Sequence, residues 1–237
     1  MKFNILKSFV NDYNEKKGML NELNWANVYH DSITDKPWLQ SLSLNIGRWA
    51  GGYSFFYILN RVLNDIKPSK ILEFGLGESS KFISTYIVNS LQETDHIIVE
   101  HDEEWVKNFN ARFALSNKSK IILKHLVKKK IKGYEVVTYG SLASEMDNDI
   151  QLYIVDGPFG SDRFSRYDII DLLNQKQNFG NFIIIFDDVD RLGEQDTVVE
   201  IFSLLESKKV NYHTGLYKGE KWQRVIVCEK FKWLTTL

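Results

Sequence analysis

The sequence predicts a doubly wound α/β protein with a mostly parallel sheet, an antiparallel edge strand and an N-terminal helical cap. Short unbroken apolar runs follow one another from residue 70 on: KILEF, HIIVE, KIILKHL, IQLYIVD and NFIIIFD. Continuous apolar runs are typical of strands that are covered on both faces, as in parallel sheets. Amphipathic segments such as SSKFISTYIVNSL and EEWVKNFNARFAL lie between several of the runs, where helical crossovers are needed.

The elements around this core can be assigned in chain order. Residues 1–45 carry apolar positions at approximately helical spacing, with Gly18 and Pro37 as breaks, and we assign them to a helical cap. Residues 46–237 form the main domain, because 237 residues suit one α/β domain rather than two. The segment 120–140 can be one strand or a hairpin that turns at Gly133. The last runs, VNYHTGLY and WQRVIVCEK, are close enough to form the antiparallel pair at the sheet edge.

Composition excludes several classes of partner. The chain has 30 Lys plus Arg against 31 Asp plus Glu, so its net charge of -1 creates no global field for nucleic acid or an anionic membrane. No segment approaches the roughly 18 apolar residues of a membrane span, and the N-terminus lacks the features of a signal peptide. We therefore expect a cytoplasmic protein with no membrane span and no nucleic-acid partner. The single cysteine, Cys228, excludes an intramolecular disulfide.

The loop after the first apolar run, within LEFGLGES, has the features of a binding loop. Gly75 and Gly77 permit a tight turn and a close approach of a ligand to the backbone. Ser79 or Ser80 can cap the following helix, whose N-terminus carries partial positive charge. In a doubly wound sheet, ligands bind beyond the carboxyl ends of the strands, which is where this loop lies.

Acidic residues near the loop predict the charge of its ligand. Glu73 and Glu78 would repel a diphosphate and attract an ammonium or a sulfonium group. The second run ends on Glu100, and a carboxylate at that strand end can accept both hydrogen bonds of a ribose diol. A Rossmann oxidoreductase that uses NAD is the alternative, but its fingerprint needs a third glycine where GLGESS has serine.

Three aspartates follow two neighbouring strands. Asp156 ends the fourth run, and Asp187 and Asp188 end the fifth, so their side chains should meet at one rim of the sheet. A hard divalent cation such as Mg²⁺ would neutralise such a cluster, which makes all three candidate metal ligands. The alternative is local: Asp188 and Asp190 cap the loop before the next helix, and Asp156 forms hydrogen bonds to the backbone around Gly157-Pro158.

These motifs resemble those of class I S-adenosylmethionine-dependent methyltransferases. LEFGLGES is similar to the first motif of that family, and Glu100 matches the acidic residue that binds the cofactor ribose. The resemblance covers roughly residues 45–229. VDGPFGSDRFSRYD and IIIFDDVDR are similar to a bacterial branch associated with surface-polysaccharide gene clusters, and more distantly to catechol O-methyltransferase. LNIG, at 44–47, is similar to a segment that contacts the cofactor carboxylate, which implies that role for Asn45 and Ile46.

The resemblance implies a Rossmann-like fold, S-adenosylmethionine as cofactor, and O-methylation of a saccharide or another small polar acceptor. In metal-dependent relatives, an Asp and an Asp-Asn pair at these strand ends bind Mg²⁺, and the three aspartates here match with Asp in place of Asn. The implied cofactor contacts are Glu73, Gly75, Gly77, Glu78, Ser79, Glu100, Asn45 and Ile46. A methyltransferase-like binding module without activity is a further alternative.

The proton acceptor and the acceptor-binding residues are predicted from position. The catechol enzyme has a catalytic lysine shortly after its fourth-strand Asp, and Pro158 and Phe159 stand there in this chain. Three residues can take over the role of base: Asp156, His101 and Asp162. Guanidinium groups suit carboxylates or phosphates of an acidic acceptor, and three arginines follow these strand ends: Arg163, Arg166 and Arg191. Salt bridges to neighbouring aspartates are the alternative for the arginines.

Overall fold

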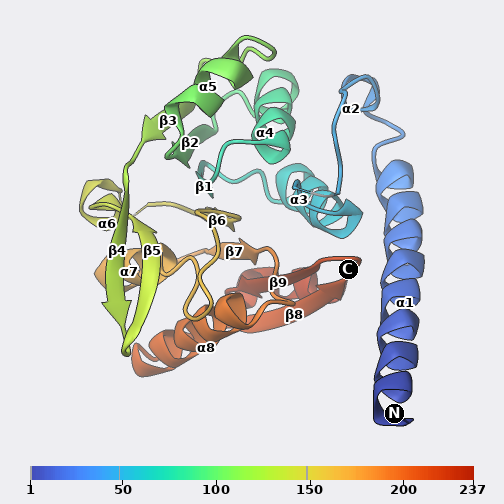
Figure 1. Ribbon diagram of the computed structural model, residues 1–237. Coiled ribbons are helices and arrows are strands. Elements are labelled where there is room, and N and C mark those ends of the chain that lie inside the picture. The colour runs from blue at the N-terminus through green and yellow to red at the C-terminus, as the bar shows by residue number, and fades with distance from the viewer. Residues whose placement is uncertain (1, 48, 148) are drawn as a thin grey trace.

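The computed structural model describes residues 2–47, 49–147 and 149–237, with side chains from residue 13 on. One sheet organises the described chain (Figure 1). Its seven strands are β1 (Lys70–Phe74), β2 (Asp95–Glu100), β3 (Ser119–Leu123), β6 (Leu152–Val155), β7 (Ile183–Phe186), β8 (His213–Lys218) and β9 (Trp222–Val227).

The strand order is β3-β2-β1-β6-β7-β9-β8. The first five of these strands run parallel, whereas β9 pairs antiparallel with both β7 and β8. The predicted doubly wound, mostly parallel sheet with antiparallel pairing at one edge is therefore confirmed. After β1 the chain moves outward to β2 and β3 and then returns to β6, so the direction of winding reverses between β1 and β6. This switch point is where a ligand site is expected.

The segment 120–140 contains both structures that the sequence allowed. After β3, a separate hairpin forms from β4 (Leu126–Ile131) and β5 (Tyr134–Tyr139). Lys132 and Gly133 make its turn with φ of 49° and 91°. Positive φ at both central residues matches the twist of a two-residue hairpin, and glycine adopts it without steric cost. The hairpin projects beside the main sheet in Figure 1.

Helices cover the sheet in two groups (Figure 1). In the first, α1 packs on α3, and both α2 and α3 pack on α4; in the second, α7 packs on α6 and α8. The helices are α1 (Lys2–Ser32), α2 (Pro37–Gln40), α3 (Tyr53–Asp65), α4 (Glu78–Asn89), α5 (Glu103–Asn110), α6 (Leu142–Glu145), α7 (Asp168–Gln175), α8 (Leu192–Ser207) and the 3₁₀ helix η1 (Glu229–Thr235). None of the helices in the described ranges is long and apolar enough to cross a membrane.

The cap helix α1 differs from the prediction in one respect. Gly18 lies inside α1 and does not break it. A helical glycine costs only about 1 kcal/mol relative to alanine, and here a side chain would point at the turn between β8 and β9, with its Cβ 3.7 Å from the Gly219 carbonyl oxygen. Met1 and the side chains of residues 2–12 of the predicted cap lie outside the described part of the chain.

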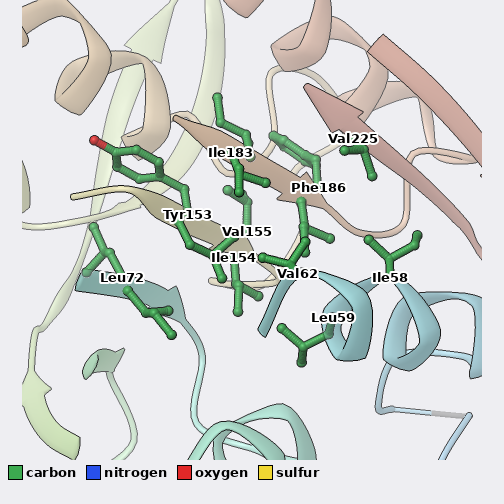
Figure 2. Close-up of a cluster of buried hydrophobic side chains, with 14 of the residues drawn as sticks. Ile58, Leu59, Val62, Leu72, Tyr153, Ile154, Val155, Ile183, Phe186 and Val225 are labelled. Atoms are coloured by element: carbon green, nitrogen blue, oxygen red, sulfur yellow. The ribbon is translucent and has the colours of Figure 1, made fainter. Parts of the chain in front are cut away.

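One part of the core lies between α3 and the centre of the sheet. Figure 2 shows Ile58, Leu59 and Val62 of α3 close to side chains from β1, β6 and β9. All three side chains are fully buried, as are Leu72 and Ile154 on the sheet. Burial of one such side chain stabilises the fold by about 1.5–3 kcal/mol. This packing holds the carboxyl ends of β1 and β6, and with them the switch point, in a fixed position.

Candidate active site at the switch point

The glycine loop between β1 and α4 is held by hydrogen bonds and is open on its outer side. Gly75 has φ of 97°, a conformation that favours glycine, and its N–H donates to the Val99 carbonyl (2.8 Å). Ser80 Oγ accepts the Gly77 N–H (3.0 Å) and donates to Glu73 Oε2 (2.8 Å). A Cβ added at Gly77 would meet nothing within 4 Å. The space above Gly77 is therefore open for a ligand.

Glu73 has a different position from the one predicted. Its side chain is fully buried and contacts His96 Nε2 (3.0 Å) as well as Ser80, and it lines none of the cavities described below. Glu73 thus holds the glycine loop through Ser80, and it does not face a ligand directly.

Glu100 ends β2 and faces the switch point. Its Oε2 accepts the Leu76 N–H (3.0 Å), and its Oε1 accepts the N–H groups of His101 (2.6 Å) and Asp102 (3.0 Å). These bonds fix the carboxylate, which is only 5% exposed. Each carboxylate oxygen can accept two hydrogen bonds, so Oε2 keeps capacity for a ligand hydroxyl.

Two adjoining cavities open at this point. The loop cavity, of about 760 Å³, is lined among others by Asn45, Ile46, Gly77, Glu78, Asp102 and Trp105. The carboxylate cavity, of about 300 Å³, is lined among others by Tyr139, Asp156, Asp188, Arg191 and Lys221. Trp49, Glu100, His101 and Phe159 line both cavities. Ser79 lines a smaller cavity of about 140 Å³ beside the loop, together with Gly75, Gly77 and Glu78.

The loop cavity is acidic. Three carboxylates line it, and its described lining residues include no lysine or arginine. Glu78 accepts the Asn45 N–H (3.2 Å) through Oε2 and pairs with Lys81 (2.7 Å) through Oε1. Glu100 and Asp102 have no lysine or arginine partner in the described structure. Coulombic attraction in this cavity favours a cationic ligand over a diphosphate.

Two of the three predicted aspartates, Asp156 and Asp188, line the carboxylate cavity, and Asp187 is buried beside them. Asp156, Asp187 and Asp188 each place an oxygen within 4.8 Å of the others. Asp187 is fully buried, and its Oδ1 accepts from Gln223 Nε2 (2.8 Å). Asp188 Oδ2 lies 2.6 Å from Arg166 and 3.1 Å from Arg191, and its Oδ1 lies 3.3 Å from Lys221. Asp156 Oδ1 lies 3.3 Å from the same Arg166 nitrogen.

Burial and charge shift the pKa values of these aspartates in different directions. Burial first, and then the nearby Asp187 carboxylate, raise the pKa of Asp156. Burial, followed by Asp188, raises the pKa of Asp187 as well. At Asp188 burial acts in the same sense, but Arg166 and Lys221 outweigh it and lower the pKa. Asp188 is therefore the carboxylate that the cations keep ionised.

The residues of this cluster do not fit a divalent cation. Cations already contact both oxygens of Asp188 and one oxygen of Asp156. Mg²⁺ needs oxygen ligands in near-octahedral geometry and is bound through carboxylates that it neutralises itself. A Mg²⁺ ion bound to Asp156 and Asp188 would lie close to the buried guanidinium of Arg166, which contacts the same two carboxylates, and the two positive charges would repel each other. The chemistry of this site therefore has to come from the side chains of the chain and not from the predicted magnesium ion.

Of the remaining predicted residues, His101 and Arg191 line a cavity, whereas Arg163 and Asp162 do not. His101 lies between the cavities, with Nδ1 2.8 Å from Glu100 Oε1 and its ring against Phe159. Arg191 is half-exposed at the carboxylate cavity. Arg163 instead pairs with Asp196, and exposed Asp162 likewise lines none of these cavities.

Several site residues escaped prediction because they come from distant segments. Lys221 enters from the turn between β8 and β9, and its Nζ also donates to the Ala50 carbonyl (3.1 Å). Glu22 of α1 accepts N–H groups from Tyr53 and from Glu220 (2.9 Å), so the cap helix ties the loop before α3 to that turn. Trp105 donates to the Leu76 carbonyl (2.7 Å) at the loop cavity. Only Trp105 had a local signal, since it lies in the first turn of the helix after Glu100.

Comparison with solved structures identifies the fold. The O-methyltransferase TomG from Streptomyces achromogenes, involved in tomaymycin synthesis and solved in complex with S-adenosylmethionine, superposes with a TM-score of 0.51 at 11% identity. The alignment covers 90% of this chain and 98% of TomG. The Bacillus cereus O-methyltransferase in complex with S-adenosylhomocysteine gives 0.49 at 10% identity, over 90% of this chain and 99% of that one. No protein-family model matches the chain, and no curated protein sequence matches it. The chain has the class I methyltransferase fold.

Proposed function

We propose that the protein is an S-adenosylmethionine-dependent methyltransferase that acts on a hydroxyl group. The observation that carries the proposal is the acidic, open loop cavity at the switch point of a class I methyltransferase fold. A sulfonium compound matches its charge, and the fold shared with TomG supports the same assignment. When bound, S-adenosylmethionine supplies a methyl group that is activated by its positive sulfur.

Different residues of the loop cavity would contact different parts of the cofactor. Glu100 Oε2 would accept a hydrogen bond from a ribose hydroxyl, and Gly77 would let the ligand approach the backbone. Glu78, Asn45 and Ile46 lie at the other side of the glycine loop, near the expected position of the methionine end. In this proposal Glu73 acts only through Ser80, by holding the loop.

The carboxylate cavity would bind the acceptor. Asp156 lies at its wall and would take the proton of the acceptor hydroxyl. Residues of the loop cavity, among them Glu100 and Gly77, would hold the S-adenosylmethionine that would supply the methyl group to the hydroxyl oxygen and leave as S-adenosylhomocysteine. Exposed Trp49 and Phe159 can stack on a sugar face, and Arg191 and Lys221 can pair with an acidic group. These features support a saccharide acceptor, as in surface-polysaccharide synthesis.

Calorimetry with S-adenosylhomocysteine and with NAD tests the cofactor class. We expect saturable binding of S-adenosylhomocysteine and none of NAD, because a diphosphate would face three carboxylates in the loop cavity. The reverse result would favour the oxidoreductase alternative. Transfer of labelled methyl groups to a panel of neutral sugars, uronic acids and sugar phosphates then separates an active enzyme from a binding module.

A side chain at position 77 should block the cofactor without harming the fold. Gly77→Leu places its Cβ in open space, where nothing lies within 4 Å, and fills the volume above the loop. We expect affinity for S-adenosylhomocysteine to fall by about 100-fold or more, on the order of 3 kcal/mol. Calorimetry measures the affinity, and thermal unfolding should show a midpoint close to that of the parent protein.

Gly77→Ala provides a graded control, because its smaller side chain should weaken binding less than leucine does. If Gly77→Leu bound S-adenosylhomocysteine as tightly as the parent protein, the cofactor would have to lie elsewhere.

A further inference from the structure

We propose that Arg166 is a built-in cation that takes the place of a divalent metal in the aspartate cluster. Its guanidinium nitrogen Nη2 contacts Asp188 at 2.6 Å and Asp156 at 3.3 Å, which are two of the three carboxylates that could have held an ion. The side chain is buried, and it arises from a loop that the sequence assigned to acceptor binding. The site therefore binds no divalent cation and remains complete in the presence of a chelator.

The backbone locks Arg166 in this position. Nη1 donates to the carbonyl of Val155 (3.2 Å), at the end of β6, and to that of Asp187 (2.9 Å), just after β7. The guanidinium thus joins the ends of two neighbouring strands and cannot swing aside without breaking both bonds. Arg166 and its partner Asp188 also have φ of 58° and 59°. Left-handed backbone at two non-glycine residues costs energy and is concentrated at functional sites.

The charges around Arg166 are already close to balance. Four carboxylates surround the guanidinium, and two further cations contact the same group. The carboxylates are Asp156, Asp187, Asp188 and Glu194, and the other cations are Arg191 and Lys221. With every group ionised the sum is -1, which a dication would reverse to +1. Buried charges need neutralisation, and here side chains of the chain itself supply it.

If the protein is the methyltransferase proposed above, the presence of Arg166 determines how many hydroxyl groups the acceptor must offer. A metal would bind two neighbouring hydroxyls of one acceptor and orient them together. With Arg166 in its place, only Asp156 contacts the reacting hydroxyl, so the acceptor needs no adjacent second hydroxyl. Arg166 is then a positioning residue that holds Asp156 and Asp188 at the wall of the carboxylate cavity.

Titration with Mn²⁺, which prefers the same oxygen ligands as Mg²⁺, tests whether the aspartate cluster binds a divalent cation. This test needs no activity assay. Calorimetry and electron paramagnetic resonance on the full chain should show no Mn²⁺ site up to about 1 mM. The unfolding midpoint should be the same with chelator and with Mg²⁺. A Mn²⁺ site with Kd below about 0.1 mM in the parent protein would overturn the proposal.

Arg166→Met removes the charge and keeps most of the volume. We expect this variant to unfold at a lower temperature in chelator, to gain a Mn²⁺ site, and to recover part of the lost stability with Mn²⁺. If Arg166→Met shows no response to Mn²⁺, the cluster is no latent metal site and the proposal is wrong. Arg163→Met is the matched control, since its arginine pairs with Asp196 outside the cavity and should gain no site.

Arg166→Lys keeps the positive charge and should therefore bind no Mn²⁺. This variant keeps the proposal testable if Arg166→Met fails to fold. A Mn²⁺ site in Arg166→Lys would contradict the proposal. Binding of S-adenosylhomocysteine to the parent protein is measured alongside. If the parent protein does not bind S-adenosylhomocysteine, the proposed function is wrong, but the Mn²⁺ titration still tests the role of Arg166. A failure of the proposed function can therefore be distinguished from a failure of the Arg166 proposal.

Discussion

Asp156→Asn should lower kcat for methyl transfer by about 100-fold or more, the usual contribution of a positioned general base. Asparagine keeps the shape of the side chain at the wall of the carboxylate cavity but cannot take a proton from the acceptor hydroxyl. Binding of S-adenosylhomocysteine should stay within about twofold of the parent value, because the loop cavity is not altered. Steady-state kinetics with the best acceptor of the sugar panel, combined with calorimetry, measures both quantities.

Asp149→Asn is the matched control for this experiment. Asp149 is exposed and pairs with Lys70, which keeps Asp147 as a second partner at 2.7 Å. Its neutralisation should leave kcat unchanged. Full activity of Asp156→Asn would move the role of base to another group, and His101→Gln would then be the next variant, since His101 lies between the two cavities.

Asp168→Asn should make the protein more resistant to alkaline pH. Asp168 begins α7, its Oδ1 accepts the Tyr139 N–H (3.0 Å), and its Oδ2 is buried with no hydrogen-bond partner in the described structure. Burial raises the pKa of Asp168 from 3.8 to about 7. The folded state therefore holds a proton that the unfolded state releases near pH 4. The stability that this proton contributes is present at low pH and is lost as pH rises through 7.

The expected size of the effect follows from the two pKa values. Between pH 5 and pH 8, ionisation of Asp168 should lower the free energy of unfolding of the parent protein by about 2–3 kcal/mol. Asparagine keeps the acceptor for Tyr139 and carries no charge at any pH, so this loss should disappear in the variant. Urea unfolding at both pH values measures the difference.

Asp171→Asn, one turn further along α7, is the control, because Asp171 is partly exposed and pairs with Lys129. After burial, the Asp171 charge also helps to raise the pKa of Asp168, so its removal should reduce the pH-dependent loss of stability but not abolish it, as Asp168→Asn does. If the free energy of unfolding changed with pH in the same way in the parent protein and in Asp168→Asn, the prediction would be wrong. Ionisation of Asp168 in the folded state would then cost little stability.

Local patterns were sufficient to predict the elements that form the frame of the site. All five apolar runs became strands of the sheet, mostly buried except for the partly exposed edge strand β3, and the stripe Ile58, Leu59 and Val62 became a buried face of α3. The glycine loop and Glu100 lie at the switch point as expected. These features depend on neighbours a few residues away, whose spacing the sequence displays directly.

Charge partners could not be predicted in the same way. The three arginines after the strand ends looked equivalent in sequence, yet Arg163 pairs with Asp196, Arg166 is buried among the aspartates, and Arg191 alone is half-exposed at the cavity. Which carboxylate a long side chain meets depends on how loops fold back in space. Glu73 shows the same limit, because its partner His96 lies on the neighbouring strand.

The sequence by itself therefore determined the sheet, its covering helices, the glycine loop and the acid at the end of β2, because periodicity and turn residues act over short distances. Only the tertiary structure decided that Arg166 neutralises the aspartates, that Lys221 joins them from the far end of the chain, and that Glu22 ties the cap to the site. Ion pairs and hydrogen bonds between distant segments depend on which segments the packing brings together, and that information is absent from local spacing.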